Sequence, residues 1–123
     1  MFETLEELIA VIRQRKGSST EESYTHKLLN NKKLSVEKVK EEIAELIDAI
    51  EKNTNKVHEA ADVLYHLMVL LEVNGIKIED VLDELKKIGL TKDTFSKREF
   101  YRLQQIEFLH RSQKINDDLF WIN

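Results

Sequence analysis

Apolar residues recur every three or four positions along most of this chain, which is the spacing of one face of an α-helix. The pattern predicts five helices, over residues 4–16, 21–29, 36–50, 56–73 and 78–88. Ser35 is expected to be the N-cap of the third helix. Asn74 with Gly75 should end the fourth helix, and Gly89 should end the fifth, because these residue types commonly follow the last helical turn.

The third and fourth predicted helices differ in how their apolar residues are distributed. The third carries a stripe that we expect to be buried, consisting of Val36, Val39, Ile43, Leu46, Ile47 and Ile50. The fourth is apolar around most of its circumference. Such a helix is usually buried by its own bundle together with a second subunit. We therefore expect a homodimer or a larger homo-oligomer.

The fold class predicted by this pattern is all-α. The chain has no proline and only three glycines in 123 residues, which leaves few points where helices must stop. We expect a bundle of four to five helices in residues 1–89 and an extension in residues 90–123 that adds a C-terminal helix, capped near Asp93 or Thr94. The extension could be a dimer clasp, a lid or an inert addition, and Phe120 and Trp121 lie near its frayed end.

Composition excludes several classes of protein. No cysteine is present, so disulfides, thiol chemistry and cysteine-ligated metals are excluded. The longest apolar run is shorter than the roughly 20 residues that span a bilayer, and the N-terminal helix lacks the features of a secretory signal. The net charge of −4 argues against a nucleic-acid partner, which needs a clustered basic surface. We expect a cytoplasmic protein.

Two pairs of acidic residues are the main candidates for chemistry. Glu42 and Glu45 lie one helical turn apart in the third predicted helix, and Glu59 and Asp62 lie one turn apart in the fourth. Residues at i and i+3 share a helix face, so each pair can reach one ion. Four carboxylates on two packed helices favour a hard cation, Mg²⁺ or Mn²⁺.

Simpler interpretations stay open at this point. The acids of the third helix would make an ordinary solvated face, and Glu59 could be a first-turn acid stabilised by the helix dipole. Asp62 sits among apolar residues and could pair with a buried lysine instead of a metal. His66 shares the polar stripe of the fourth helix and would more often be a packed histidine than a ligand.

The order and spacing of these acids also resemble a known family. Glu42-x-x-Glu45, thirteen residues and Glu59-x-x-Asp62 match the pattern of the all-α nucleotide pyrophosphohydrolases, which include the MazG type and the dimeric dUTPases. The run Ser23-Tyr24-Thr25 and the run from Asp62 to Leu71 narrow the resemblance to phosphoribosyl-ATP pyrophosphohydrolase, the second enzyme of histidine biosynthesis. This resemblance covers residues 2–88.

The resemblance implies a fold, an activity and a set of site residues. It implies a homodimer that hydrolyses phosphoribosyl-ATP to phosphoribosyl-AMP and pyrophosphate with Mg²⁺, and it makes the four acids metal ligands and catalytic residues. Lys38 and Lys27 are candidates for binding the phosphates as ammonium donors. Ser23 and Thr25 could bind phosphate or ribose hydroxyls, although capping of a short helix explains them equally well.

The chain departs from the family at two positions near the acids. Lys40 stands where glycine is usual, and His58 stands where another acid is common. Two alternative functions therefore stay in view: a broader, house-cleaning nucleoside triphosphate pyrophosphohydrolase, and a non-catalytic helical dimerisation module.

Overall fold

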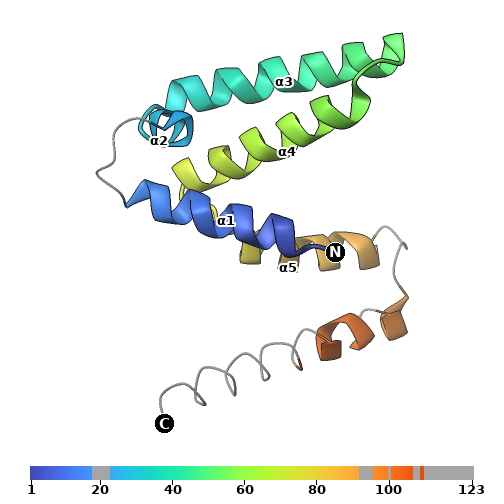
Figure 1. Cartoon of the computed structure of the whole chain (residues 1–123). Coiled ribbons are helices and arrows are strands. Elements are labelled where there is room, and N and C mark those ends of the chain that lie inside the picture. The colour runs from blue at the N-terminus through green and yellow to red at the C-terminus, as the bar shows by residue number, and fades with distance from the viewer. Residues whose placement is uncertain (18–22, 92–95, 100, 107–108, 110–123) are drawn as a thin grey trace. The chain divides into compact units, whose positions relative to one another are not determined.

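The computed structural model describes residues 1–17, 23–91, 96–99, 101–106 and 109 (Figure 1). Its elements are α1 (Glu3–Lys16), α2 (Tyr24–Leu29), α3 (Lys32–Lys52), α4 (Lys56–Val73) and α5 (Ile78–Thr91). Residues 97–99 and 101–106 are also helical, and these described ranges contain no β-strand. The predicted all-α fold class is therefore confirmed. No helix in this part of the chain is long and apolar enough to cross a membrane.

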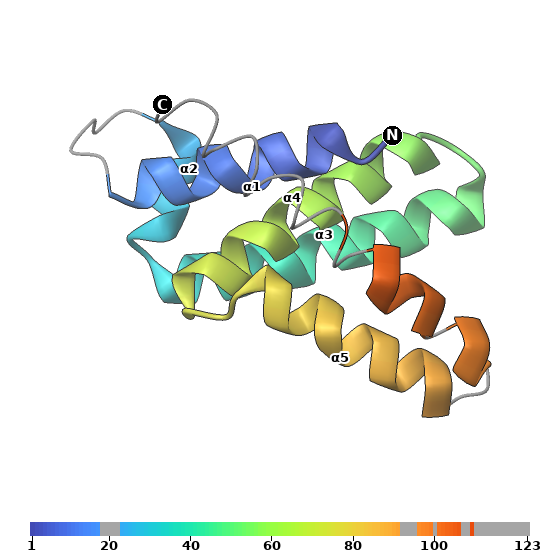
Figure 2. The same ribbon diagram turned by 90° about the horizontal axis from the view of Figure 1, so that it is seen from below.

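The chain divides into two compact units, Met1–Ile78 and Glu79–Asn123. The first unit holds α1 to α4 and all of the predicted site residues. Within it, α3 and α4 lie side by side in both views of the chain (Figures 1 and 2), and they make the most extensive helix pair of the unit. The turn between them contains Asn53 and Asn55 with φ of 56° and 47°. Asparagine tolerates this left-handed conformation better than most residues, which suits it to a tight helix connection.

The core of the first unit lies where α1, α2 and α4 meet. Its buried residues are Ile12, Leu28, Leu29, Val69 and Val73. Leu8, Leu34, Tyr65 and Met68 pack around them and are partly buried. The short helix α2 is therefore held in place by its two leucines, although it is only 6 residues long. This anchoring fixes the N-terminus of α2 beside α4.

The predicted start of the third helix was wrong. Asn31 is the N-cap of α3, and its side chain accepts a hydrogen bond of 3.0 Å from the backbone N–H of Leu34. Ser35 lies inside the helix and is buried, with its hydroxyl donating to the backbone carbonyl of Leu28 at 2.7 Å. Ser35 thus adds a second hydrogen bond to a carbonyl near the end of α2 that also accepts from the backbone N–H of Asn31 at 3.2 Å. Local spacing does not reveal this tertiary role.

The stripe expected to be buried on the third helix is not fully buried within a single copy of the chain. Val39 is buried and Leu46 is partly buried, but four aliphatic side chains are between 40% and 57% exposed: Val36, Ile43, Ile47 and Ile50. The reason is that α3 turns the face of Val39, Glu42 and Ala49 toward the unit. The adjacent aliphatic face is left open. We call these four residues the aliphatic stripe of α3.

The ends of the fourth and fifth helices were predicted from the positions of Gly75 and Gly89, and one of the two predictions is confirmed. Helix α4 has the predicted bounds, and Gly75 takes the expected left-handed conformation with φ of 67°. Gly89 does not end α5, because the helix continues to Thr91. A glycine inside a helix costs only about 1 kcal/mol relative to alanine, so flanking residues can carry the helix through it. The caps expected at Asp93 or Thr94, and the end at Phe120 and Trp121, lie outside the described residues.

Candidate metal centre

The packing of α3 against α4 brings the two predicted acidic pairs together. Ligand atoms of Glu42, Asp62 and His66 lie within 4.8 Å of one another, and so do those of His58, Glu59 and Asp62. Glu45 belongs to a third group of this kind with Glu42. Asp62 and Glu42 therefore link the groups. We call Glu42, Glu45, Glu59 and Asp62 the acidic cluster.

Two oxygens of the acidic cluster are buried without a hydrogen-bond partner in the described part of the chain. They are Oε2 of Glu42 and Oε2 of Glu59. Glu42 as a whole is only 8% exposed. A buried carboxylate oxygen without a partner is costly, and a cation is one of the few groups that can satisfy it. The side chains therefore fit a divalent metal, and an all-oxygen set suits Mg²⁺ or Mn²⁺.

The electrostatics of the cluster lead to the same conclusion. Burial raises the pKa of Glu42 above its ordinary value, and the negative charge of Glu45 raises it further. Burial and the charge of Glu45 also raise the pKa of Glu59. Like charges held close together disfavour ionisation, and a bound cation would reverse this effect. The cluster is thus arranged to lose protons when a metal binds.

His66 connects the cluster to α2. It is 6% exposed, and its Nδ1 lies 2.8 Å from the backbone carbonyl oxygen of Asp62. Its Nε2 lies 3.0 Å from the hydroxyl of Tyr24 on α2. Both ring nitrogens therefore have hydrogen-bond partners, which agrees with a packed histidine and not with a metal ligand. A second bond between α2 and α4 joins the hydroxyls of Thr25 and Tyr65.

The four residues predicted to contact phosphate or ribose lie in different surroundings. Lys38 lies on α3 with its Nζ 3.2 Å from Oε2 of Glu41, and the hydrogen bond to Glu41 together with its negative charge raises the pKa of Lys38. Lys27 is exposed on α2 and makes no ion pair within the described residues. Ser23 is the N-cap of α2 and accepts a hydrogen bond of 3.0 Å from the backbone N–H of His26. The hydroxyl of Thr25 is occupied by Tyr65.

Several residues at the centre were not among the predicted site residues. Tyr24, Tyr65 and His66 form an aromatic group beside the cluster, and His58 lies 3.3 Å from Oδ2 of Asp62 through its Nε2. Tyr24 stands between the two hydroxyl residues that the sequence singled out. Because a tyrosine in a short helix has no distinctive spacing, only the fold reveals that it meets His66.

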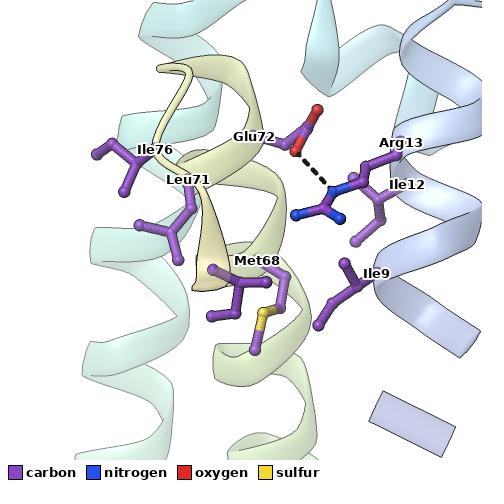
Figure 3. A pocket seen from close by; sticks show the side chains of 8 residues that line it. Ile9, Ile12, Arg13, Met68, Leu71, Glu72 and Ile76 are labelled. Atoms are coloured by element: carbon purple, nitrogen blue, oxygen red, sulfur yellow. Dashed lines mark ion pairs between the residues drawn. The ribbon is translucent and has the colours of Figure 1, made fainter. Parts of the chain in front are cut away.

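A separate small cavity between α1 and α4 does not compete with this centre. Figure 3 shows its lining of mainly aliphatic side chains, with Arg13 paired to Glu72 at 3.8 Å. Its volume is about 10 Å³, which is room for no more than one water molecule. Lys16 also holds Glu72, donating to its backbone carbonyl at 2.8 Å. The cavity is thus a packing feature where α1 meets the end of α4.

Comparison with known proteins gives a consistent family. A family described as phosphoribosyl-ATP pyrophosphohydrolase matches residues 5–88. The chain is 40% identical over 90 residues to the phosphoribosyl-ATP pyrophosphatase of Haloarcula marismortui, which covers 69% of this chain and 92% of the relative. It is 44% identical over 91 residues to the enzyme of that name from Methylobacterium nodulans, covering 68% of this chain and 81% of the relative.

A plant relative is longer. The histidine biosynthesis bifunctional protein hisIE of Arabidopsis thaliana is 42% identical over 92 residues, which is 68% of this chain but 33% of the relative. The match thus corresponds to one part of a two-function protein. All three relatives align over a similar share of this chain. The chain belongs to the phosphoribosyl-ATP pyrophosphohydrolase family.

Proposed function

We propose that this chain hydrolyses phosphoribosyl-ATP to phosphoribosyl-AMP and pyrophosphate, the second step of histidine biosynthesis. Family membership over residues 5–88 supports the reaction. The single structural observation that carries the proposal is the buried, unpartnered oxygen of Glu42 among the other three carboxylates of the acidic cluster. A pyrophosphate-releasing enzyme must counter the negative charge of several phosphates, and a cluster built for a divalent cation does this.

The proposed cofactor is Mg²⁺, with Mn²⁺ as an alternative, held by Glu42, Glu45, Glu59 and Asp62. When bound, such a cation neutralises phosphate oxygens and favours ionisation of a water molecule. The role of this chain's residues is to hold the carboxylates in register. The α3–α4 packing sets the distance between the pairs, and the bond from His66 to the carbonyl of Asp62 fixes the local backbone. A carboxylate oxygen of the acidic cluster that does not hold the cation would accept the proton of the attacking water.

The phosphates need cationic donors as well as a metal. Lys38 is the proposed donor because it lies next to Glu41 and interacts electrostatically with Glu42 and Tyr24. Lys27 stays a second candidate from the sequence. The hydroxyls of Ser23 and Thr25 hold α2 in place, so a contact of either with the nucleotide would add to a bond that the residue already makes.

We propose a homodimer formed through the aliphatic stripe of α3. Ile43, Ile47 and Ile50 are exposed along one face of α3, and Lys40 lies on the same face between Val36 and Ile43. On α4, Leu64 and Leu67 are 50% and 37% exposed. Burying such a face against a second copy removes it from water at about 25 cal/mol per Å². From Ile43 to Ile50 the stripe carries no charged residue on its own face, so this part is complementary to itself, as a two-fold interface needs.

The proposal also covers the domain organisation and the place where the protein works. Residues 1–89 form the catalytic domain, and residues 90–123 form a C-terminal extension, which could be a dimer clasp, a lid or an inert addition. The protein works in the cytoplasm on a small nucleotide and without nucleic acid or membrane.

A substrate panel scored by pyrophosphate release tests the function. Purified protein with Mg²⁺ should release pyrophosphate from phosphoribosyl-ATP far faster than from ATP, dUTP or oxidised nucleoside triphosphates. Preferential hydrolysis of ordinary or oxidised triphosphates would favour the broader pyrophosphohydrolase. No release from any member of the panel would favour a non-catalytic module.

A further inference from the structure

The hydrogen-bond directions around His66 follow from its partners. A backbone carbonyl can only accept, so the Nδ1 of His66 must donate to the carbonyl oxygen of Asp62 at 2.8 Å. In a neutral imidazole the other nitrogen then carries a lone pair and accepts. With His66 in this neutral form, the hydroxyl of Tyr24, 3.0 Å from Nε2, donates its proton to His66.

This direction determines what the Tyr24 oxygen can offer to a ligand. A phenol has one proton, and here it is committed to His66. The oxygen keeps lone pairs that can accept, and Tyr24 has no further hydrogen-bond partner in the described part of the chain. Its side chain is 48% exposed, so a ligand can reach it. Tyr24 is thus an acceptor for a hydrogen-bond donor, and it is a poor partner for a phosphate, which carries only acceptors at neutral pH.

The position of Tyr24 places this acceptor beside the acidic cluster. Lys38 and Glu42 both interact electrostatically with its hydroxyl. The ring is fixed by stacking on Tyr65, with centroids 6.4 Å apart and an angle of 24° between the planes, and by an edge contact with His66. Tyr24 is therefore a rigid group at the edge of the site where the proposed phosphates would bind.

We propose that Tyr24 accepts a hydrogen bond from a hydroxyl of the adenosine ribose of the bound nucleotide. The inference rests on the proposed function, because it takes the acidic cluster as the place of the polyphosphate. In a nucleotide the ribose is joined directly to the α-phosphate, and its hydroxyls are the donors nearest to the phosphate chain. His66 is a positioning residue, since it takes the Tyr24 proton and turns the free lone pairs toward the ligand.

Equilibrium binding of three probes tests the proposal. The probes are phosphoribosyl-ATP with a methylene group in place of the α,β-bridging oxygen, and its analogues that lack the 2′- or the 3′-hydroxyl of the adenosine ribose. Affinities would be measured by calorimetry with Mg²⁺ for the wild type and for Tyr24→Phe. Tyr65→Phe is a matched control, because it also removes a hydroxyl from the aromatic group but one that bonds Thr25.

The expected result is a non-additive pattern. Wild type should bind one of the two deoxy probes about three- to tenfold more weakly than the parent, the value of one hydrogen bond. Tyr24→Phe should bind the parent more weakly by the same factor and should lose nothing further with that deoxy probe. Tyr65→Phe should retain the full difference between the parent and that probe.

Two results would overturn the inference, and they are distinguishable. If Tyr24→Phe still discriminates between the parent and deoxy probes as the wild type does, Tyr24 does not contact the ribose although the substrate site is real. If the wild type binds none of the three probes while its helical circular dichroism is intact, the proposed function fails and this inference falls with it.

Discussion

Glu42 on α3 and Asp62 on α4 bring carboxylate oxygens within 4.8 Å of each other across the helix pair. They are 20 residues apart in sequence, and one of the Glu42 oxygens is buried without a partner among the described residues. Two like charges this close and this far from water oppose folding unless a proton or a cation joins them.

Neutralising Glu42 should have opposite effects on stability with and without metal. In metal-free buffer Glu42→Gln should raise the midpoint of thermal unfolding by roughly 3 °C, because a buried charge is removed. With Mg²⁺ present, the wild type should be stabilised and the variant should not, since ligand binding to the native state raises its stability. Differential scanning calorimetry in buffer with Mg²⁺ and in buffer with excess EDTA measures both effects.

Glu51→Gln is the control for this experiment, because Glu51 is an exposed acid near the end of the same helix. It should change neither the metal-free midpoint nor the stabilisation by Mg²⁺. An equal stabilisation of Glu42→Gln and wild type by Mg²⁺ would contradict the assignment of Glu42 as a ligand.

The metal-free protein should lose stability as the pH rises through the titration of the cluster. The pKa values of Glu42 and Glu59 are raised above 4.5 in the folded state, so the native protein binds more protons than the unfolded chain in that window. Stability contributed by these protons is present below the unfolded pKa and is lost as the pH rises through the folded pKa values. Urea unfolding over a series of pH values from about 4 to about 8 gives the free energy of unfolding. This free energy should fall less steeply with pH for Glu42→Gln than for the wild type.

Lys38→Gln should weaken substrate binding more than catalysis. Loss of one charge-assisted contact to a phosphate should raise KM by about tenfold with a smaller change in kcat, if the contact exists in the ground state and the transition state alike. Lys52→Gln is the matched control, since Lys52 is on the same helix and pairs with Asp48 at 3.1 Å. Equal KM values for the two variants would remove Lys38 from the phosphate site.

A charge in the aliphatic stripe of α3 should separate the subunits. Ile43→Glu should convert the dimer to a monomer at micromolar concentration, because an unpaired charge at the centre of an apolar interface is strongly unfavourable. Val11→Glu on α1 is a matched control, since Val11 and Ile43 are both 42% exposed. Light scattering after gel filtration gives the masses. A monomeric wild type, or dissociation by both variants, would contradict the proposed interface.

The sequence predicted those features that depend on residues close together along the chain. The bounds of α4 and the left-handed Gly75 follow from local spacing and capping, and the structure confirms both. The proximity of the two acidic pairs followed from their shared helical spacing and from the expectation that the two helices pack together. The cluster is therefore brought together as that spacing implied.

Features set by tertiary contact were not predictable in this way. Ser35 looked like an N-cap, but the carbonyl of Leu28 on another helix draws it into the interior. The burial of Val39 and the exposure of Ile47 depend on which face α3 turns toward α4, and both residues have the same apolar character. The partnership of Tyr24 with His66 joins residues 42 positions apart and has no local signature.

The most direct test of the central claim is pyrophosphate release from phosphoribosyl-ATP by the wild type and by Asp62→Asn, each measured with Mg²⁺ and with excess EDTA. Release is expected only from the wild type with Mg²⁺, and Asp62→Asn should lose at least about a thousandfold in kcat/KM, equivalent to about 4 kcal/mol. Release by Asp62→Asn at the wild-type rate, or undiminished release in EDTA, would contradict the central claim.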